Sequence, residues 1–211
     1  MKWMGMMILA VTLMAGPGRA TAEMSDIKRL EASRMVYLEG LAQLDPYLVL
    51  AASKLRAPVR MMRADRAPQG GSAAQAGPIS AVAMLGVALD MAQGDPVAEA
   101  AVKATRATMD QAVPKGLQGG PAFNSAAIVA KGKDRYPGLT FKGGRFAEIY
   151  IEGHGGANLD LFVYDGKGRL VCSDTDISDF AHCGWYPQST ETYTVQVTNK
   201  GNGTQYSLVT N

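Results

Sequence analysis

The hydrophobic pattern of this chain changes its period near Gly119, and this change constrains the fold more than any other feature. Before it, apolar residues recur at the three-to-four-residue spacing of amphipathic helices, and after it they alternate with polar residues. Such a switch indicates a helical region followed by a β-region with its own core. We therefore expect an α+β protein, with a small N-terminal helical region over residues 23–118 and an antiparallel β-sandwich over residues 119–211.

Local signals mark the expected helices. Ser25 is suited to cap a first helix, and Asp45-Pro46 and Asp95-Pro96 each place an N-cap residue before a proline at the first helical position. Residues 56–77 are rich in Arg, Pro, Gly and Ala, which predicts a loop. Residues 78–92 are apolar nearly all round, which predicts a helix that is buried on several sides.

Alternating residues mark the expected strands, at 147–151, 159–163, 193–197 and 206–208. Asp165-Gly166-Lys167-Gly168 and Lys200-Gly201-Asn202-Gly203 have the composition of hairpin turns. Short strands joined by Gly-rich and Asn-rich turns are typical of a β-sandwich.

The first 22 residues have the features of a secretory signal. Lys2 gives a positive start, Trp3–Ala15 is apolar but too short to span a bilayer, and Ala20-Thr21-Ala22 is a small-residue cleavage site. A retained membrane anchor is the alternative that this length disfavours. We therefore expect a periplasmic or secreted protein with no membrane anchor after cleavage.

Charge argues against nucleic acid as a partner. The chain has 21 Lys and Arg against 19 Asp and Glu, and loss of the signal, which contains Lys2 and Arg19, leaves the two signs balanced. Proteins whose main partner is a nucleic acid normally carry a marked positive excess.

Several segments of the β-region together resemble one known family. They are NLDLFVYD at 158–165, Gly168, CSDTD at 172–176, WYP at 185–187, TYTVQV at 192–197 and YSL at 206–208. In this order they resemble the bacterial pre-peptidase C-terminal (PPC) domain family, over residues 119–211. The resemblance implies a jelly-roll-like sandwich of about eight strands that follows a secreted protease and aids secretion or binds substrate, such as polysaccharide or fibrous protein. The helical region has no such resemblance, and the chain contains no HExxH peptidase motif.

The chain's two cysteines, Cys172 and Cys183, predict a disulfide, because an even pair in an exported chain is normally oxidised. The alternative is a zinc site that adds His154 and His182 to the two cysteines. Their spacing fits none of the usual paired-ligand patterns.

An acidic stretch and an aromatic pair give two further candidate sites. The oxygen-bearing residues Asn158, Asp160, Asp174, Asp176 and Asp179 could hold calcium, which takes six to eight oxygen ligands. The alternative is that they form turns by bonding their own backbone. Trp185 and Tyr186 could form an exposed platform for a sugar or peptide, and the alternative is a core tryptophan.

No set of nucleophile, base and orienting residue is recognisable, so we expect no enzyme and no cofactor other than calcium. The leading hypothesis is a non-catalytic binding or accessory protein of the cell envelope that recognises a glycan or another exported protein. The apolar segment 78–92 favours a second hypothesis, a stabiliser or folding partner of an exported enzyme. A hydrolase with an unrecognised site comes third.

Overall fold

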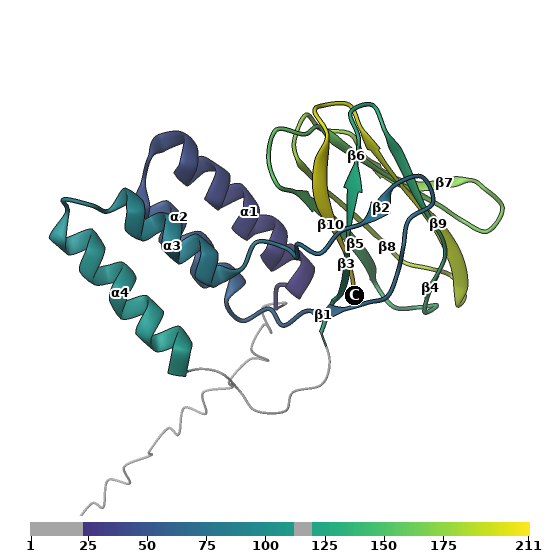
Figure 1. Cartoon of the computed structure of the whole chain (residues 1–211). Helices are drawn as coiled ribbons and strands as arrows, with labels where there is room; N and C mark the ends of the chain where they lie inside the picture. The colour runs from purple at the N-terminus through teal and green to yellow at the C-terminus, as the bar shows by residue number, and fades with distance from the viewer. Residues whose placement is uncertain (1–22, 112–119) are drawn as a thin grey trace, which may run out of the picture.

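The structure, a computed structural model, describes residues 23–111 and 120–211, so the predicted signal lies outside the described residues. A group of four helices lies beside a β-sandwich (Figure 1), which confirms the predicted fold class. The helices are α1 (Asp26–Gln43), α2 (Pro46–Arg56), α3 (Ala81–Met91) and α4 (Pro96–Gln111).

The predicted helix caps form as expected. The Ser25 hydroxyl accepts a hydrogen bond from the amide of Lys28, and Asp45 and Asp95 each accept two from the first turn that follows. These bonds satisfy amides that have no partner inside the helix. Helix α3 begins later than Pro78, because Ser80 is its cap.

Helix α3 buries one face only. Met84, Leu85 and Ala88 pack into a core with α2 and α4, whereas Val82 is exposed. The prediction of burial on several sides is therefore wrong. Two neighbouring helices cover one side of α3 and leave the other to solvent.

Eight strands form the sandwich: β3 (Ala122–Ile128), β4 (Lys133–Phe141), β5 (Ala147–Gly153), β6 (Leu159–Tyr164), β7 (Leu170–Asp174), β8 (Phe180–Trp185), β9 (Glu191–Asn199) and β10 (Thr204–Thr210). One sheet has the order β3-β10-β5-β8 and the other β4-β9-β6-β7, with every pair antiparallel. This is the strand order of a jelly roll.

The alternation predicted for these strands is borne out on the inner faces. Buried apolar side chains from both sheets meet there: Ile149, Ile151, Leu159, Leu161, Val163, Val195, Val197 and Leu208. In β5, however, the intervening polar residues Glu148, Tyr150 and Glu152 are buried too, because α1 packs over this part of the sheet.

One predicted hairpin forms and the other does not. Residues 165–168 join the paired strands β6 and β7, with the Asp165 carboxylate accepting from the amides of Lys167 and Arg169 and with Gly168 at a φ of 76°. Residues 200–203 instead join β9 in one sheet to β10 in the other. The buried Asn199 side chain fixes this corner by bonding Val129, Gly201 and Asn202.

The segment between α2 and α3 runs along the edge of the sandwich and contacts both sheets. Its two short strands, β1 (Met62–Arg63) and β2 (Ser72–Ala73), both pair with β3, and Gln69 bridges to Arg135 in the other sheet. Two short pieces of the predicted helical region, 23–118, therefore extend one sheet of the sandwich.

A buried ion pair joins the helices to the sandwich. Arg56, in the last turn of α2, binds Glu152 of β5 with both terminal nitrogens, at 2.8 and 2.7 Å. The same guanidinium donates to the carbonyls of Leu30 and Ile79, and Glu152 also accepts from the Tyr150 hydroxyl and the Ile79 amide. Burial raises the pKa of Glu152, but Arg56 outweighs this effect and keeps the pKa below its ordinary value.

Other contacts surround this pair. Arg34 of α1 forms a second buried ion pair with Asp179 and donates to the carbonyl of Gly153 at 3.0 Å.

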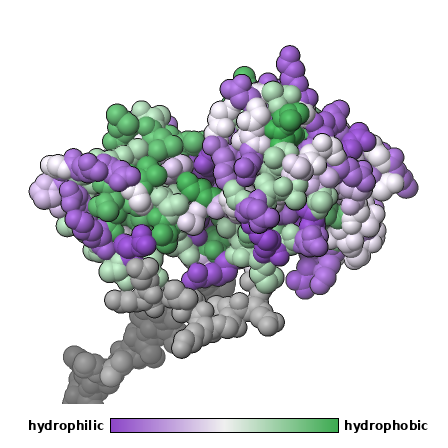
Figure 2. Space-filling view, viewed as in Figure 1, coloured by the Kyte–Doolittle hydropathy of each residue, from purple (hydrophilic) through white to green (hydrophobic). Residues whose placement is uncertain are grey.

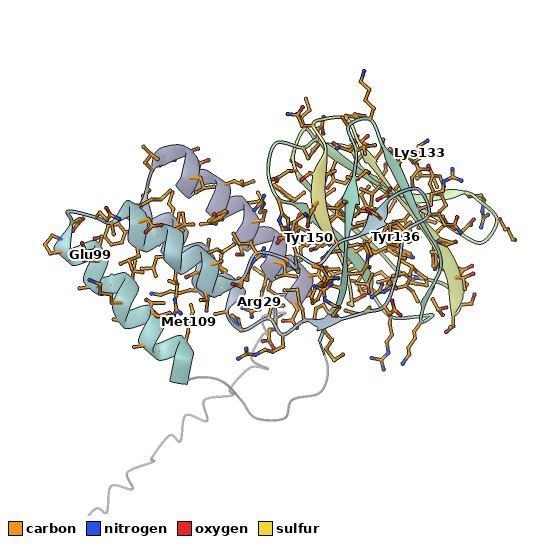
Figure 3. All side chains as sticks on the ribbon, in the orientation of Figure 1. Arg29, Glu99, Met109, Lys133, Tyr136 and Tyr150 are labelled. Carbon is orange, nitrogen blue, oxygen red and sulfur yellow. A yellow bond between two sulfur atoms is a disulfide. The ribbon has the colours of Figure 1, made fainter. Side chains whose placement is uncertain are left out.

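An apolar cluster also joins the two parts: Ile27, Leu30 and Val59 pack against Tyr150 and Val209 on the outer face of the sheet. Tyr150 lies where the helices meet the sandwich (Figure 3). The two parts therefore pack as one unit.

The Arg56–Glu152 pair gives a stability prediction. Glu152→Gln should lower the free energy of unfolding by about 3–5 kcal/mol, because Arg56 would remain buried without a counter-charge. The double variant Arg56→Met/Glu152→Gln should lose less than the sum of the two single variants. Urea unfolding measures all three. Lys103→Ala, which breaks an exposed pair with Glu99, is the control and should have little effect. Additive losses would contradict the coupling.

Asp134 is a buried carboxyl inside the sandwich. Asp134 accepts from the Tyr206 hydroxyl at 2.8 Å, and Tyr206 in turn bonds the Tyr136 hydroxyl at 2.7 Å. Burial raises the pKa of Asp134 above its ordinary 3.8, which the bond from Tyr206 only partly offsets, and burial raises the pKa of Tyr136 to about 12. A carboxyl whose pKa is raised by folding favours the folded state at low pH and costs stability once it is deprotonated.

Asp134→Asn should therefore raise the melting temperature at pH 7 and change it less at pH 4. The asparagine keeps an acceptor for Tyr206 but removes the buried negative charge that develops as pH rises through the raised pKa. Thermal melts at the two pH values measure this effect. The exposed Asp176→Asn variant is the control, and equal shifts at both pH values would refute the prediction.

Candidate ligand-binding site

The structure does not gather the predicted calcium ligands into one site. Asp179 is the partner of Arg34, Asp160 binds Lys200 at 2.7 Å, and Asp174 accepts from the backbone amides of Asp176 and His182. Within residues 23–111 and 120–211, no group of three or more His, Cys, Asp and Glu side chains could hold a metal ion. Cations of the chain and backbone amides bind these carboxylates and so compete with calcium, whose binding at this site stays a prediction.

Thermal melts in calcium and in EDTA should agree within experimental error if these contacts exclude calcium. A calcium site at 100 times its dissociation constant would add about 2.7 kcal/mol and raise the melting temperature by roughly 5–10 °C. A shift of that size would instead support the calcium prediction. It would assign an ion to the one oxygen each of Asn158, Asp160 and Asp179 that accepts no hydrogen bond from the described residues.

The predicted disulfide is present between Cys172 of β7 and Cys183 of β8, with a Cα–Cα distance of 5.9 Å. These strands are the adjoining edges of the two sheets, so the bond closes one side of the sandwich. Because both cysteines are oxidised, the zinc alternative does not apply, and His154 is an exposed loop residue.

A cluster around His182 was not anticipated from the sequence. Its Nε2 lies 3.2 Å from the Glu148 carboxylate on β5, and its Nδ1 lies 4.0 Å from Glu31 on α1. Burial raises the pKa of Glu148, but hydrogen bonds from His182 and Ser25 outweigh it and leave the pKa below its ordinary value. Both ring nitrogens face carboxylates, and the cluster holds the start of α1 against the sheet.

The structure separates the two residues of the predicted aromatic platform. Trp185 is a core residue, 9% exposed, in edge-to-face contact with Phe141 and Tyr193. It shares the inward face of β8 with Ala181 and Cys183. Tyr186, at 66% exposure, instead pairs with Phe146, which is 41% exposed, and their ring centroids are 4.9 Å apart.

A close approach to Gly184 positions the exposed pair. A Cβ atom added to Gly184 would lie 2.7 Å from the ring of Phe146, so this ring lies directly over the glycine backbone. The absence of a side chain at 184 lets the Phe146 ring approach the sheet beside Tyr186. Sequence reasoning missed Phe146, although an aromatic residue outside a regular apolar pattern could have marked it.

Phe146 also borders a hollow of about 580 Å³. Residues 140–142, 145–147 and Asn211 line it, and the cations Lys142 and Arg145 are both exposed. No acidic side chain is among the described residues that line it. The hollow and the aromatic pair together form a surface with an apolar part and a cationic part, which we call the aromatic–cationic site (Lys142, Arg145, Phe146 and Tyr186).

Backbone hydrogen bonds hold this site in place. The Gly144 amide donates to the Pro187 carbonyl at 2.8 Å, and the Gly143 amide donates to the Thr190 hydroxyl at 3.1 Å. The Asn211 side chain donates to the Phe146 carbonyl and accepts from the Glu148 amide, both at 2.9 Å. The loop that carries three of the four site residues is therefore bonded to the loop after β8, which favours binding because little ordering is needed.

Comparison with known proteins gives structural similarities alone. No protein-family model matches the chain, and no curated protein matches it significantly. The PPC domain of a collagenase from Bacillus anthracis is similar over 42% of this chain and 87% of that chain, at 11% identity and a TM-score of 0.35.

Two other solved structures show the same level of similarity. PliG from Aeromonas hydrophila, a periplasmic inhibitor of g-type lysozyme, matches over 46% of this chain and 89% of its own, at 16% identity and a TM-score of 0.33. The C-terminal CBM6 domain of LamC from Zobellia galactanivorans matches over 42% and 80%, at 12% identity and a TM-score of 0.28. These values are too low to transfer a ligand or an activity to this chain.

Proposed function

We propose that this chain is an exported, non-catalytic binding module of the cell envelope that recognises a glycan at the aromatic–cationic site. The exposed Phe146–Tyr186 pair beside a hollow is the observation that carries the proposal. A sugar ring has apolar C–H groups on its face and hydroxyls around its edge. It therefore suits a surface where aromatic rings adjoin polar groups.

The position of the site in the fold supports this function. Phe146 and Tyr186 lie on loops at one end of a rigid sandwich, where binding residues commonly occur. The PPC resemblance of residues 119–211 is in accord with a substrate-binding role, and the disulfide fits an oxidising compartment outside the cytoplasm. No helix in the described ranges has the length and apolar character needed to cross a membrane.

The absence of catalysis is part of the proposal. His182, the less exposed of the two histidines, lies between two carboxylates, and the cysteines form a disulfide. Nucleophilic catalysis needs a nucleophile in contact with a base that a third group orients. The contacts of His182 are better explained by attachment of α1 to the sheet.

The alternative of a stabiliser or folding partner for an exported enzyme has less support. The apolar segment 78–92 favours this alternative, yet the structure buries Met84, Leu85 and Ala88 of the segment within the chain's own helical core. Hydrophobic residues are visible over the helical part, whereas the viewed face of the sandwich is mostly hydrophilic (Figure 2). A groove of about 260 Å³ lies between α3 and α4.

The glycan proposal predicts that the protein is retained by at least one member of a polysaccharide panel, for example xylan, laminarin, chitin, peptidoglycan, alginate and polygalacturonate. Phe146→Ala and Tyr186→Ala should each weaken binding roughly tenfold, as expected for a central aromatic contact. Affinity electrophoresis and pull-down measure this effect.

The matched control is Tyr47→Ala, which removes an exposed tyrosine from helix α2. It should bind as the unchanged protein does. Failure to bind any polysaccharide, or equal binding by the Phe146 and Tyr186 variants, would refute the proposed function.

A further inference from the structure

The charge beside the aromatic pair narrows the ligand class, if the proposed function holds. Lys142 and Arg145 both line the hollow next to Phe146, and no ion pair joins either of them to another described residue. Elsewhere in the described chain, basic side chains repeatedly pair with acids, as Arg34, Arg56 and Lys200 do. The site therefore carries two cations without a paired acid, in a chain whose charges balance once the predicted signal is removed.

One turn of the chain carries both cations, and both line the same hollow. The Arg145 amide donates to the Lys142 carbonyl across Gly143 and Gly144, so one tight turn carries both side chains. The bonds from this turn to Pro187 and Thr190 fix the backbone beneath them. Two like charges on one anchored turn repel each other, and an anion bound between them would relieve this repulsion.

We infer that the aromatic–cationic site binds an acidic saccharide, a polysaccharide whose sugar units carry carboxylates. The ring of one unit would lie against Phe146 and Tyr186, and its carboxylate would face Arg145 and Lys142. The planar guanidinium of arginine can bond both oxygens of a carboxylate, and lysine adds a point charge. A neutral sugar would leave these two cations unused.

Uronate polymers as a class fit both parts of the site. A polyanion that lacks sugar rings would use the charges without the aromatic pair, and a neutral glycan would use the rings without the charges. The inference therefore requires that binding depend on both parts of the site, which separates it from simple attraction between opposite charges.

The experiment compares three probes by isothermal titration or affinity electrophoresis: polygalacturonate, neutral xylan and poly-glutamate. Polygalacturonate should bind most tightly. Arg145→Gln should weaken its binding roughly tenfold or more, because a hydrogen bond between two charged groups is lost. Phe146→Ala should weaken it as well, and a rise from 50 mM to 500 mM salt, about a threefold shorter screening length, should reduce it further.

Lys133→Gln is the matched control. Lys133 is exposed and begins β4, whereas the turn with Lys142 follows the other end of this strand. Removal of this distant charge should leave the affinity for polygalacturonate unchanged. Thermal melts of all variants establish that each one folds, and Tyr186→Ala replaces Phe146→Ala if the latter unfolds.

The outcomes separate the inference from the proposed function. Xylan bound as tightly as polygalacturonate, with no effect of Arg145→Gln, would overturn the acidic-saccharide inference and leave glycan binding intact. Poly-glutamate bound as tightly as polygalacturonate, with no effect of the aromatic variants, would also overturn it. Absence of binding to every saccharide, in this experiment and in the wider panel, would overturn both.

Discussion

The paired burial of Arg56 and Glu152 determines how the two parts of this protein fit together. Removing two charges from water costs several kcal/mol for each ion, so the arrangement is stable only where the geometry satisfies both. Here α1 and the segment before α3 supply further partners for the pair, through Leu30, Ser33 and Ile79. A displaced helical region would leave a buried charge without a partner, so the ion pair selects one docking position.

That docking decides which part of the outer sheet face remains available. Residues 146, 148, 150 and 152 point to the same face, and α1 covers the last three together with His182. Phe146, and Tyr186 beside it, remain exposed to solvent. The helical region therefore supports the sheet at the junction and leaves one end free, where loops bonded to each other and to Asn211 hold the aromatic–cationic site.

Short sequence motifs predicted the features that depend on hydrogen bonds between residues close in sequence. The helix caps at Ser25, Asp45 and Asp95 and the hairpin at 165–168 depend on bonds within a few residues, and each formed as expected. Strand β4 escaped prediction because Pro137 and Gly138 interrupt it. The structure tolerates them since β4 is an edge strand with an irregular register at this point. The turn at 200–203 was misassigned because its composition does not reveal which sheet the next strand joins.

Sequence alone determined the class of the fold, the disulfide and the inward residues of the main strands, because periodicity and compartment govern these features. Tertiary structure decided which charged residues form ion pairs within the chain and which are exposed to solvent. Lys200 and Arg34 bind Asp160 and Asp179, whereas no acid among the described residues forms an ion pair with Lys142 or Arg145. Ion pairs of this kind join residues forty or more positions apart, and no local pattern specifies them.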